Sequence, residues 1–177
     1  PVSMTNLVSS VGVVATDVTG VGTARQALAS TQYGGDKGIF GYGYIGGAAV
    51  SSLTNLVSNV GVVASDVTGV GTERYALAAC EYGDDKGIFA YGQTADPVSM
   101  SNLVSNVGVI ASDVTGVGTA RAAPAETQYG GDKGIFGYGT TGSNVSMTNL
   151  VSNAGVVATD VTGVGSARSS LAACSYN

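Results

Sequence analysis

One segment of this 177-residue chain occurs four times, and that repetition is the strongest constraint on its fold. It reads TNLVSSVGVVATDVTGVGTAR over residues 5–25 and returns with few changes over residues 54–74, 101–121 and 148–168. A second segment, YGGDKGIFGYG or a close variant, stands between successive copies. The copies are offset by 49, 47 and 47 residues, a period typical of paired-helix solenoids or of four-stranded propeller blades.

The composition decides between these two architectures. The chain has 28 glycines, and no apolar spacing of three to four residues is sustained over ten positions, which excludes helices. In the unit that begins at Arg74, we expect strands over residues 74–82, 87–92, 98–105 and 107–114, with a tight turn at Asn106. The sequence therefore predicts an all-β fold of about four four-stranded repeats.

The order of these segments resembles the kelch repeat. TAR, LAA and GDKGIFGYG are followed by NLV and GVVASDV, although the paired kelch glycines are represented only by Gly41 and Gly43 around Tyr42, and the chain has no Trp. The repeat sequence is also similar to kelch-type repeats predicted in tail-fibre and other structural proteins of tailed bacterial viruses. The resemblance implies a kelch-like β-propeller. A β-solenoid is the alternative, since about 47 residues would also make two rungs of a parallel β-helix.

The phase of the repeat predicts one repeat domain with incomplete ends. It comprises an N-terminal half-blade 1–24, repeats 25–73, 74–120 and 121–167, and a C-terminal strand 168–177. Pairing of the first and last segments would join the ends, but a second strand would be missing there and would leave unpaired edges. We therefore expect a propeller that is split or completed by another chain, with self-association favoured. Because Pro1 is not a methionine and no signal sequence follows, we also expect a processed or excised piece.

Charge and residue usage exclude several function classes. The net charge is -5 and the seven Lys and Arg residues are spread through the repeats, so we expect no nucleic-acid partner. No apolar run approaches the roughly 20 residues that cross a bilayer, so we expect no membrane partner. With no histidine and two cysteines, a His-based triad and a zinc site are not expected. The sequence predicts no enzymatic activity, no cofactor and no metal.

An aspartate and an arginine stand eight residues apart on either side of each TGVG segment. We expect each such pair to form an ion pair that holds the passage between blades, and one carboxylate per loop is too few for calcium. The pairs are Asp17 and Arg25, Asp66 and Arg74, Asp113 and Arg121, and Asp160 and Arg168.

The two cysteines occupy the same LAAC position two units apart. The alignment places Ser30 and Glu126 at this position in the other units. We expect Cys80 and Cys174 to be buried free thiols near the propeller axis, or to form a disulfide if their Cα atoms approach within about 7 Å.

The copies differ most in the connector after each YG pair. Loops on a rigid scaffold are where recognition usually resides, so a ligand such as a glycan would bind there. The candidate contacts are Tyr44, Ile45, Gln93, Thr94, Asp96, Thr140 and Thr141, with Tyr42, Tyr91 and Tyr138 close by.

These features predict a non-enzymatic structural or adhesion module. It would be extracellular or virion-associated, part of a fibre or similar assembly, with other copies of the chain as partners. The alternative is a carbohydrate-binding lectin with one shallow site per blade, because four copies would supply four equivalent sites.

Overall fold

The computed structural model describes residues 1–176, which form antiparallel β-sheets and no helix. Three three-stranded sheets and one short hairpin follow one another along the chain. The all-β prediction is confirmed, and the antiparallel pairing contradicts the parallel β-helix alternative. The first sheet contains β1 (Ala29–Tyr33), β2 (Lys37–Gly41) and β5 (Thr54–Val57); the second β6 (Ala78–Tyr82), β7 (Lys86–Ala90) and β8 (Ser101–Val104); the third β9 (Ala125–Tyr129), β10 (Lys133–Gly137) and β11 (Thr148–Val151).

The central strand of each sheet follows from the GDKGIF sequence. In the first sheet, Ile39 stands opposite Thr31 of β1 and Leu56 of β5, so β2 is paired along both edges. Alternation along β2 turns Ile39 and Phe40 to opposite faces, as expected for a strand covered on both sides. The hairpin β3 (Tyr44–Gly46) and β4 (Ala49–Val50) leaves this sheet between β2 and β5.

The expected fourth strand of each unit does not form a regular strand. In the second unit it meets β8 only through two isolated bridges, Ser101 to Val114 and Val104 to Ile110. Between them, the side-chain amide of Asn102 donates to the carbonyl of Ala111 at 3.0 Å. In a regular strand, this carbonyl would accept a hydrogen bond from the backbone of β8. The Asn102 side chain takes that place, and the backbone pairing is interrupted there.

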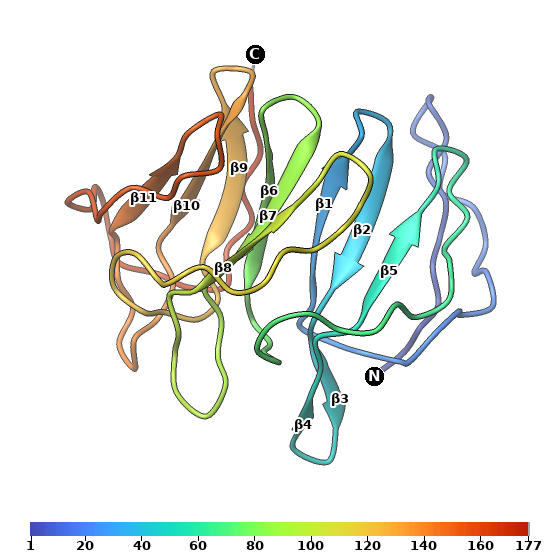
Figure 1. Ribbon diagram of the computed structural model, residues 1–177, viewed down its shortest axis with the longest axis horizontal. Helices are drawn as coiled ribbons and strands as arrows, with labels where there is room; N and C mark the ends of the chain where they lie inside the picture. Colours follow the sequence, from blue (N-terminus) through green and yellow to red (C-terminus); the bar gives the residue numbers. More distant parts are fainter. Residues whose placement is uncertain (177) are drawn as a thin grey trace.

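The three sheets stand side by side in chain order (Figure 1). Their first strands β1, β6 and β9 are the neighbours across successive sheets. Residues 1–25 lie beside β5 at one end of the row, and the last residues pass beside β9 at the other. Within residues 1–176, the first and last segments form no bridge with each other, so the ends of the row are not joined. These residues therefore make an open row.

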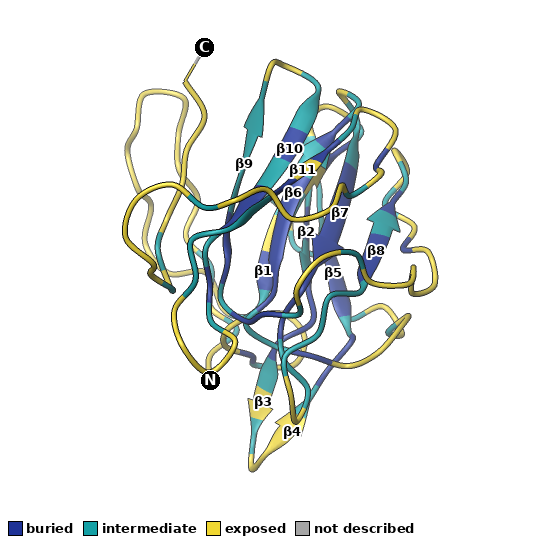
Figure 2. Cartoon of the chain, turned by 90° about the vertical axis from the view of Figure 1, so that its left-hand side faces the viewer, coloured by how far each residue is buried: buried dark blue, intermediate teal, exposed yellow. Residues whose placement is uncertain are grey.

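The apolar core lies between sheets. Ile39 of the first sheet belongs to one cluster with Phe89 of the second, and Ile88 of the second belongs to another with Phe136 of the third. Burial is greatest in the middle sheet and falls toward the ends of the row (Figure 2). Gly41 permits the close contact, since a Cβ there would lie 2.8 Å from Cζ of Phe89. Since the described residues include no helix, none of them forms an apolar helix long enough to cross a membrane.

Candidate functional site: the junctions between sheets

Polar side chains, most of them buried, gather where one sheet meets the next and define two equivalent junctions. Each junction contains an arginine, an aromatic pair, an asparagine and an aspartate. The first junction consists of Arg74, Tyr42, Phe89, Asn102 and Asp113, and the second of Arg121, Tyr91, Phe136, Asn149 and Asp160.

Arg74 is the centre of the first junction and is fully buried. Its Nε donates to the carbonyl of Tyr91 at 2.9 Å, and its Nη2 donates to Oδ1 of Asn102 at 2.7 Å. Its Nη1 donates to the carbonyl of Thr72 at 3.1 Å and lies 3.9 Å from Oδ1 of Asp113. Burial lowers the pKa of Arg74, and the charge of Asp113 offsets part of this effect. These partners allow a cation inside the protein, because a buried charge is stable only when paired and hydrogen-bonded.

Tyr42 from the first sheet covers the face of this guanidinium. Cζ of Arg74 lies 4.3 Å from the centroid of the Tyr42 ring, within cation–π range. The same ring meets Phe89 edge-on, with centroids 5.3 Å apart. Burial raises the pKa of Tyr42 to about 12, so the phenol stays neutral at physiological pH. One tyrosine therefore binds both an arginine and a phenylalanine of the following sheet.

The backbone of Tyr42 is held in a conformation that few aromatic residues adopt. Its φ is 64°, in the left-handed region. Its N–H donates to the carbonyl of Leu53, and the N–H of Gly43 donates to the carbonyl of Arg74, both at 2.9 Å. These hydrogen bonds offset the strain and aim the ring into the junction. The same φ recurs at Tyr91 (61°) and Tyr138 (63°).

Asp113 ties the incoming connector to the second sheet. Its carboxylate accepts from the hydroxyl of Thr72 at 2.7 Å and from the amide of Asn102 at 2.9 Å. Desolvation raises the pKa of Asp113, but these hydrogen bonds outweigh it and the net pKa is lowered. The negative charge is therefore retained beside Arg74.

The second junction repeats this plan with fewer hydrogen bonds. Cζ of Arg121 lies 3.9 Å from the ring of Tyr91, and Nη1 lies 3.9 Å from Asp160. Within the described residues, Nε of Arg121 and Oδ1 of Asn149 are buried without a hydrogen-bond partner. The first junction is thus the better satisfied of the two.

The expected ion pairs across TGVG are wrong in their partners. Arg74 pairs with Asp113 and Arg121 with Asp160, each an aspartate near the end of the same repeat. Asp66, expected beside Arg74, instead accepts from Thr23 and Asn55. The two members of each expected pair are held apart, because the threonine that follows TGVG binds the aspartate of the next sheet.

The outermost members of this series make fewer contacts. Asp17 accepts from Asn6 at 2.8 Å. Arg25 donates to Asn55, and Arg168 is exposed with Cζ 4.4 Å from the ring of Tyr138. These residues belong to the two ends of the row, where the neighbouring sheet is incomplete.

The two cysteines differ in environment. Both are free; Cys80 is buried and Cys174 is exposed, so the prediction of two buried thiols is wrong for Cys174. Desolvation raises the pKa of Cys80 to about 12, which makes its thiol unreactive. Strand register also corrects the alignment: Cys80 stands opposite Ile88 as Thr31 stands opposite Ile39, so Thr31 and Thr127, and not Ser30 and Glu126, are its counterparts.

The variable connectors lie along one edge of the row, the lower edge in Figure 1. Tyr44 and Ile45 belong to β3, where Tyr44 packs on Tyr75 with centroids 5.8 Å apart. Gln93, Thr94 and Asp96, and likewise Thr140 and Thr141, form compact turns, such as Thr94 N–H to Asp96 carbonyl at 3.0 Å. Tyr42 and Tyr91 are fully buried, so neither ring is exposed to a ligand at the connectors.

Glu126 in β9 is a carboxyl at a position where the second sheet has an alanine. It stands opposite Phe136, at the position that Ala79 holds opposite Phe89. Desolvation raises its pKa to about 7. Because the pKa of Glu126 is raised in the folded state, the folded protein binds more protons at this carboxyl than the unfolded chain does. The protein is therefore expected to lose stability as the pH rises from the unfolded-state pKa of the carboxyl toward 7.

Replacing Glu126 by alanine is expected to stabilise the protein at pH 8. After a discount for the partly exposed carboxyl, we expect a rise of about 1 kcal/mol in the free energy of unfolding, and little change at about pH 3, where the carboxyl is almost fully protonated in both states. Urea denaturation at the two pH values measures this difference. An equal change at both would show that packing, and not ionisation, is responsible.

Sequence reasoning missed the threonines and tyrosines of the junctions. Thr23, Thr72 and Thr119 each bind an aspartate of the following unit through both hydroxyl and backbone N–H. The available signal was the constant spacing of Thr, or Ser in the last copy, two residues before each arginine. No protein-family model matches the chain, and no curated protein matches it. The interpretation of the site therefore rests on these contacts alone.

Proposed function

We propose that this chain is a non-enzymatic structural or adhesion module of kelch-like β-propeller repeats, part of a fibre or virion-associated assembly outside the cell. Its three sheets correspond to successive blades, with β1, β6 and β9 innermost. The supporting observation is the junction, in which the reactive and charged groups are used to bind one sheet to the next. Arg74 and Arg121 are fully buried, and all three side-chain nitrogens of Arg74 donate to these contacts.

The three lysines form ion pairs within the hairpin turns. Each lysine pairs with the aspartate before it in a hairpin turn: Lys37 with Asp36 and Lys86 with Asp85 at 2.6 Å, and Lys133 with Asp132 at 3.0 Å. The turns are joined as well, since Gly34 N–H donates to the carbonyl of Asp85 at 2.7 Å, and Gly83 N–H to that of Asp132 at 2.8 Å. Polar groups that bind neighbouring units favour a spacer over a catalyst.

The alternative of a glycan-binding lectin is supported by the alignment of the variable connectors on one edge. Their exposed polar side chains would be the contacts. The buried tyrosines leave this alternative without the aromatic platform that sugar binding commonly uses.

Two measurements test the proposal. Pulled between its ends in optical tweezers, the chain is expected to resist extension and to unfold in three near-equal steps, one for each sheet, because the units are near-identical and joined by short-range contacts. On a glycan array, it is expected to give no saturable binding. Extension at low force in one continuous event would contradict the structural role. Glycan binding that is lost when residues 44–50 and 93–97 are replaced by the TTGSN connector would establish the lectin instead.

A further inference from the structure

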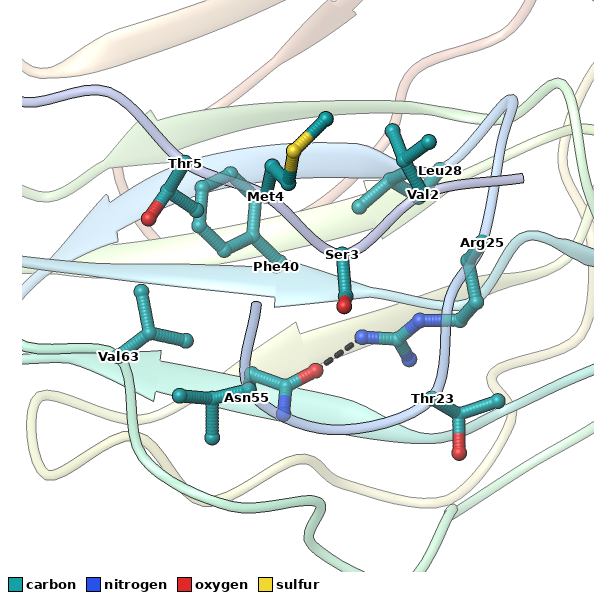
Figure 3. Close-up of a pocket in the computed structure, with 11 residues that line it drawn as sticks. Val2, Ser3, Met4, Thr5, Thr23, Arg25, Leu28, Phe40, Asn55 and Val63 are labelled. Atoms are coloured by element: carbon teal, nitrogen blue, oxygen red, sulfur yellow. Dashed lines mark hydrogen bonds between the residues drawn. The ribbon is translucent and has the colours of Figure 1, made fainter. Parts of the chain in front are cut away.

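A cavity opens at the N-terminal end of the row, between residues 1–5 and the first sheet (Figure 3). It has a volume of about 230 Å³ and is lined by Arg25, Leu28, Phe40 and Asn55, together with Ser3 and Thr5. The Arg25 side chain lies along one side with its guanidinium donating to Asn55, and the Phe40 ring lies on the other. The cavity thus combines a cation, an aromatic ring and an amide.

The same set of residues surrounds a tyrosine at both junctions. Tyr42 fills the space between Arg74 and Phe89, and Tyr91 fills the space between Arg121 and Phe136. Phe89 and Phe136 are fully buried there, whereas Phe40 is only half-buried. The cavity is therefore shaped to receive a tyrosine from a GIFGYG segment.

The other end of the row presents such a tyrosine. Tyr138 follows β10 and is half-buried, with Arg168 on its face and without a phenylalanine at its edge among the described residues. The segment that covers β10, residues 144–168, is identical to residues 1–25 at 21 of 25 positions. Beyond it, residues 169–176 form no strand, and Tyr176 is 96% exposed although its counterpart Tyr33 is 4% exposed.

Side chains of the N-terminal segment are exposed, although their counterparts in later repeats are buried. Val8 is 65% exposed, whereas Val104 and Val151, at the same repeat position, are fully buried. These two valines pack beside a central strand, since Val104 stands opposite Gly87 and Val151 opposite Gly134. Asn6 is likewise exposed, while Asn102 and Asn149 are buried. Residues 5–8 therefore present a free strand edge that matches β10.

We infer that two copies of the chain join end to end by segment exchange: residues 1–33 of one copy take the place of residues 144–176 of the other beside β9 and β10. This rests on the proposed structural function and names a second copy as its partner. Tyr138 of the first copy enters the cavity between Arg25 and Phe40 of the second. Asp17 of the second copy receives Thr119 of the first, as Asp160 does within one chain.

The balance of contacts favours the exchange. Pairing of residues 148–151 with β10 is replaced like for like by pairing of residues 5–8, which carry the same TNLV sequence. The additional contacts are the filled cavity, the Tyr138–Phe40 pair and the burial of Val8, while the contacts given up are those of the irregular residues 169–176. Because the surfaces are different at the two ends, the contact is head-to-tail and repeats as a linear array.

A designed cysteine pair tests this arrangement. Ile135 stands opposite Leu150, so after exchange it stands opposite Leu7 of the second copy. Opposed strand positions are close enough for a disulfide. In the full chain with Cys174→Ser, the pair Leu7→Cys and Ile135→Cys is expected to give, on mild oxidation, a ladder of covalent oligomers in multiples of 17.4 kDa. Reduction with dithiothreitol should remove the ladder.

The matched control carries Leu150→Cys with Ile135→Cys on the same background. It is expected to close a disulfide within one chain, to hold residues 144–176 in place and to remain at 17.4 kDa, because exchange is blocked. Both variants share Ile135→Cys, so any loss of folding from that change affects them equally and is monitored by circular dichroism.

Sedimentation velocity of the unmodified chain over a range of concentrations completes the test. Mass that rises with concentration, together with the ladder, supports the exchange. No ladder with a constant mass of 17.4 kDa overturns it, and leaves the pulling experiment on single chains as the test of the structural function. No ladder with a rising mass also overturns it, and shows that copies assemble through another surface.

Discussion

Replacing Arg74 by alanine is expected to lower the free energy of unfolding by about 4 kcal/mol. The change removes a fully buried side chain that donates to Tyr91, Asn102 and Thr72. It also leaves Asp113 without its cation and opens a cavity beside the ring of Tyr42. Denaturation in urea, followed by circular dichroism, measures the loss.

Arg168 supplies the control for this effect. It has the same repeat position and the same stacking on a tyrosine, 4.4 Å from the Tyr138 centroid, but it is exposed. Arg168→Ala is expected to lower the free energy of unfolding by no more than about 1 kcal/mol. Equal losses for the two variants would show that stacking, and not the buried hydrogen bonds, makes the arginine important.

Replacing Phe89 by alanine is expected to lower the free energy of unfolding by about 4 kcal/mol. The ring is fully buried, contacts Tyr42 edge-on and packs on Gly41 of the neighbouring sheet. Glycine provides no side chain that could move into the space, so the cavity would persist.

Phe40 is the matched position in the first sheet. It is half-buried and lines the terminal cavity, so Phe40→Ala is expected to lower the free energy of unfolding by about 1 kcal/mol. Urea denaturation of both variants compares them directly. If Phe40→Ala proved as destabilising as Phe89→Ala, the stability would lie within each sheet and the junctions would contribute little.

The strands that were predicted from sequence are those with a local signal. Alternating Val, Ile, Phe and small residues, bounded by the DKG turn, gave β6 and β7 within a few residues of their observed bounds. The same holds for β8, which begins at Ser101 and ends just before the turn at Asn106. These elements are fixed by neighbours close in sequence.

Contacts between residues far apart in the sequence could not be predicted in this way. Eight residues separate Asp66 from Arg74, yet Arg74 pairs with Asp113 at the far end of its own repeat, because every position of a repeated sequence has several equivalent partners. The fourth strand was also overpredicted, since GVIASDV has strand composition but Asn102 binds one of its carbonyls. The tyrosines are predicted to lie near a ligand because nothing in the local sequence indicates that the next arginine covers them.

Each junction joins only two neighbouring units, and this has an evolutionary consequence. Tyr42 contacts its own unit and the one that follows it, and Arg74 contacts the sheets on its two sides. Duplication or deletion of a 47-residue stretch in the gene would therefore create or remove a complete junction without altering those that remain. Recombination between such similar stretches could adjust the length of the protein while selection on each contact stayed the same.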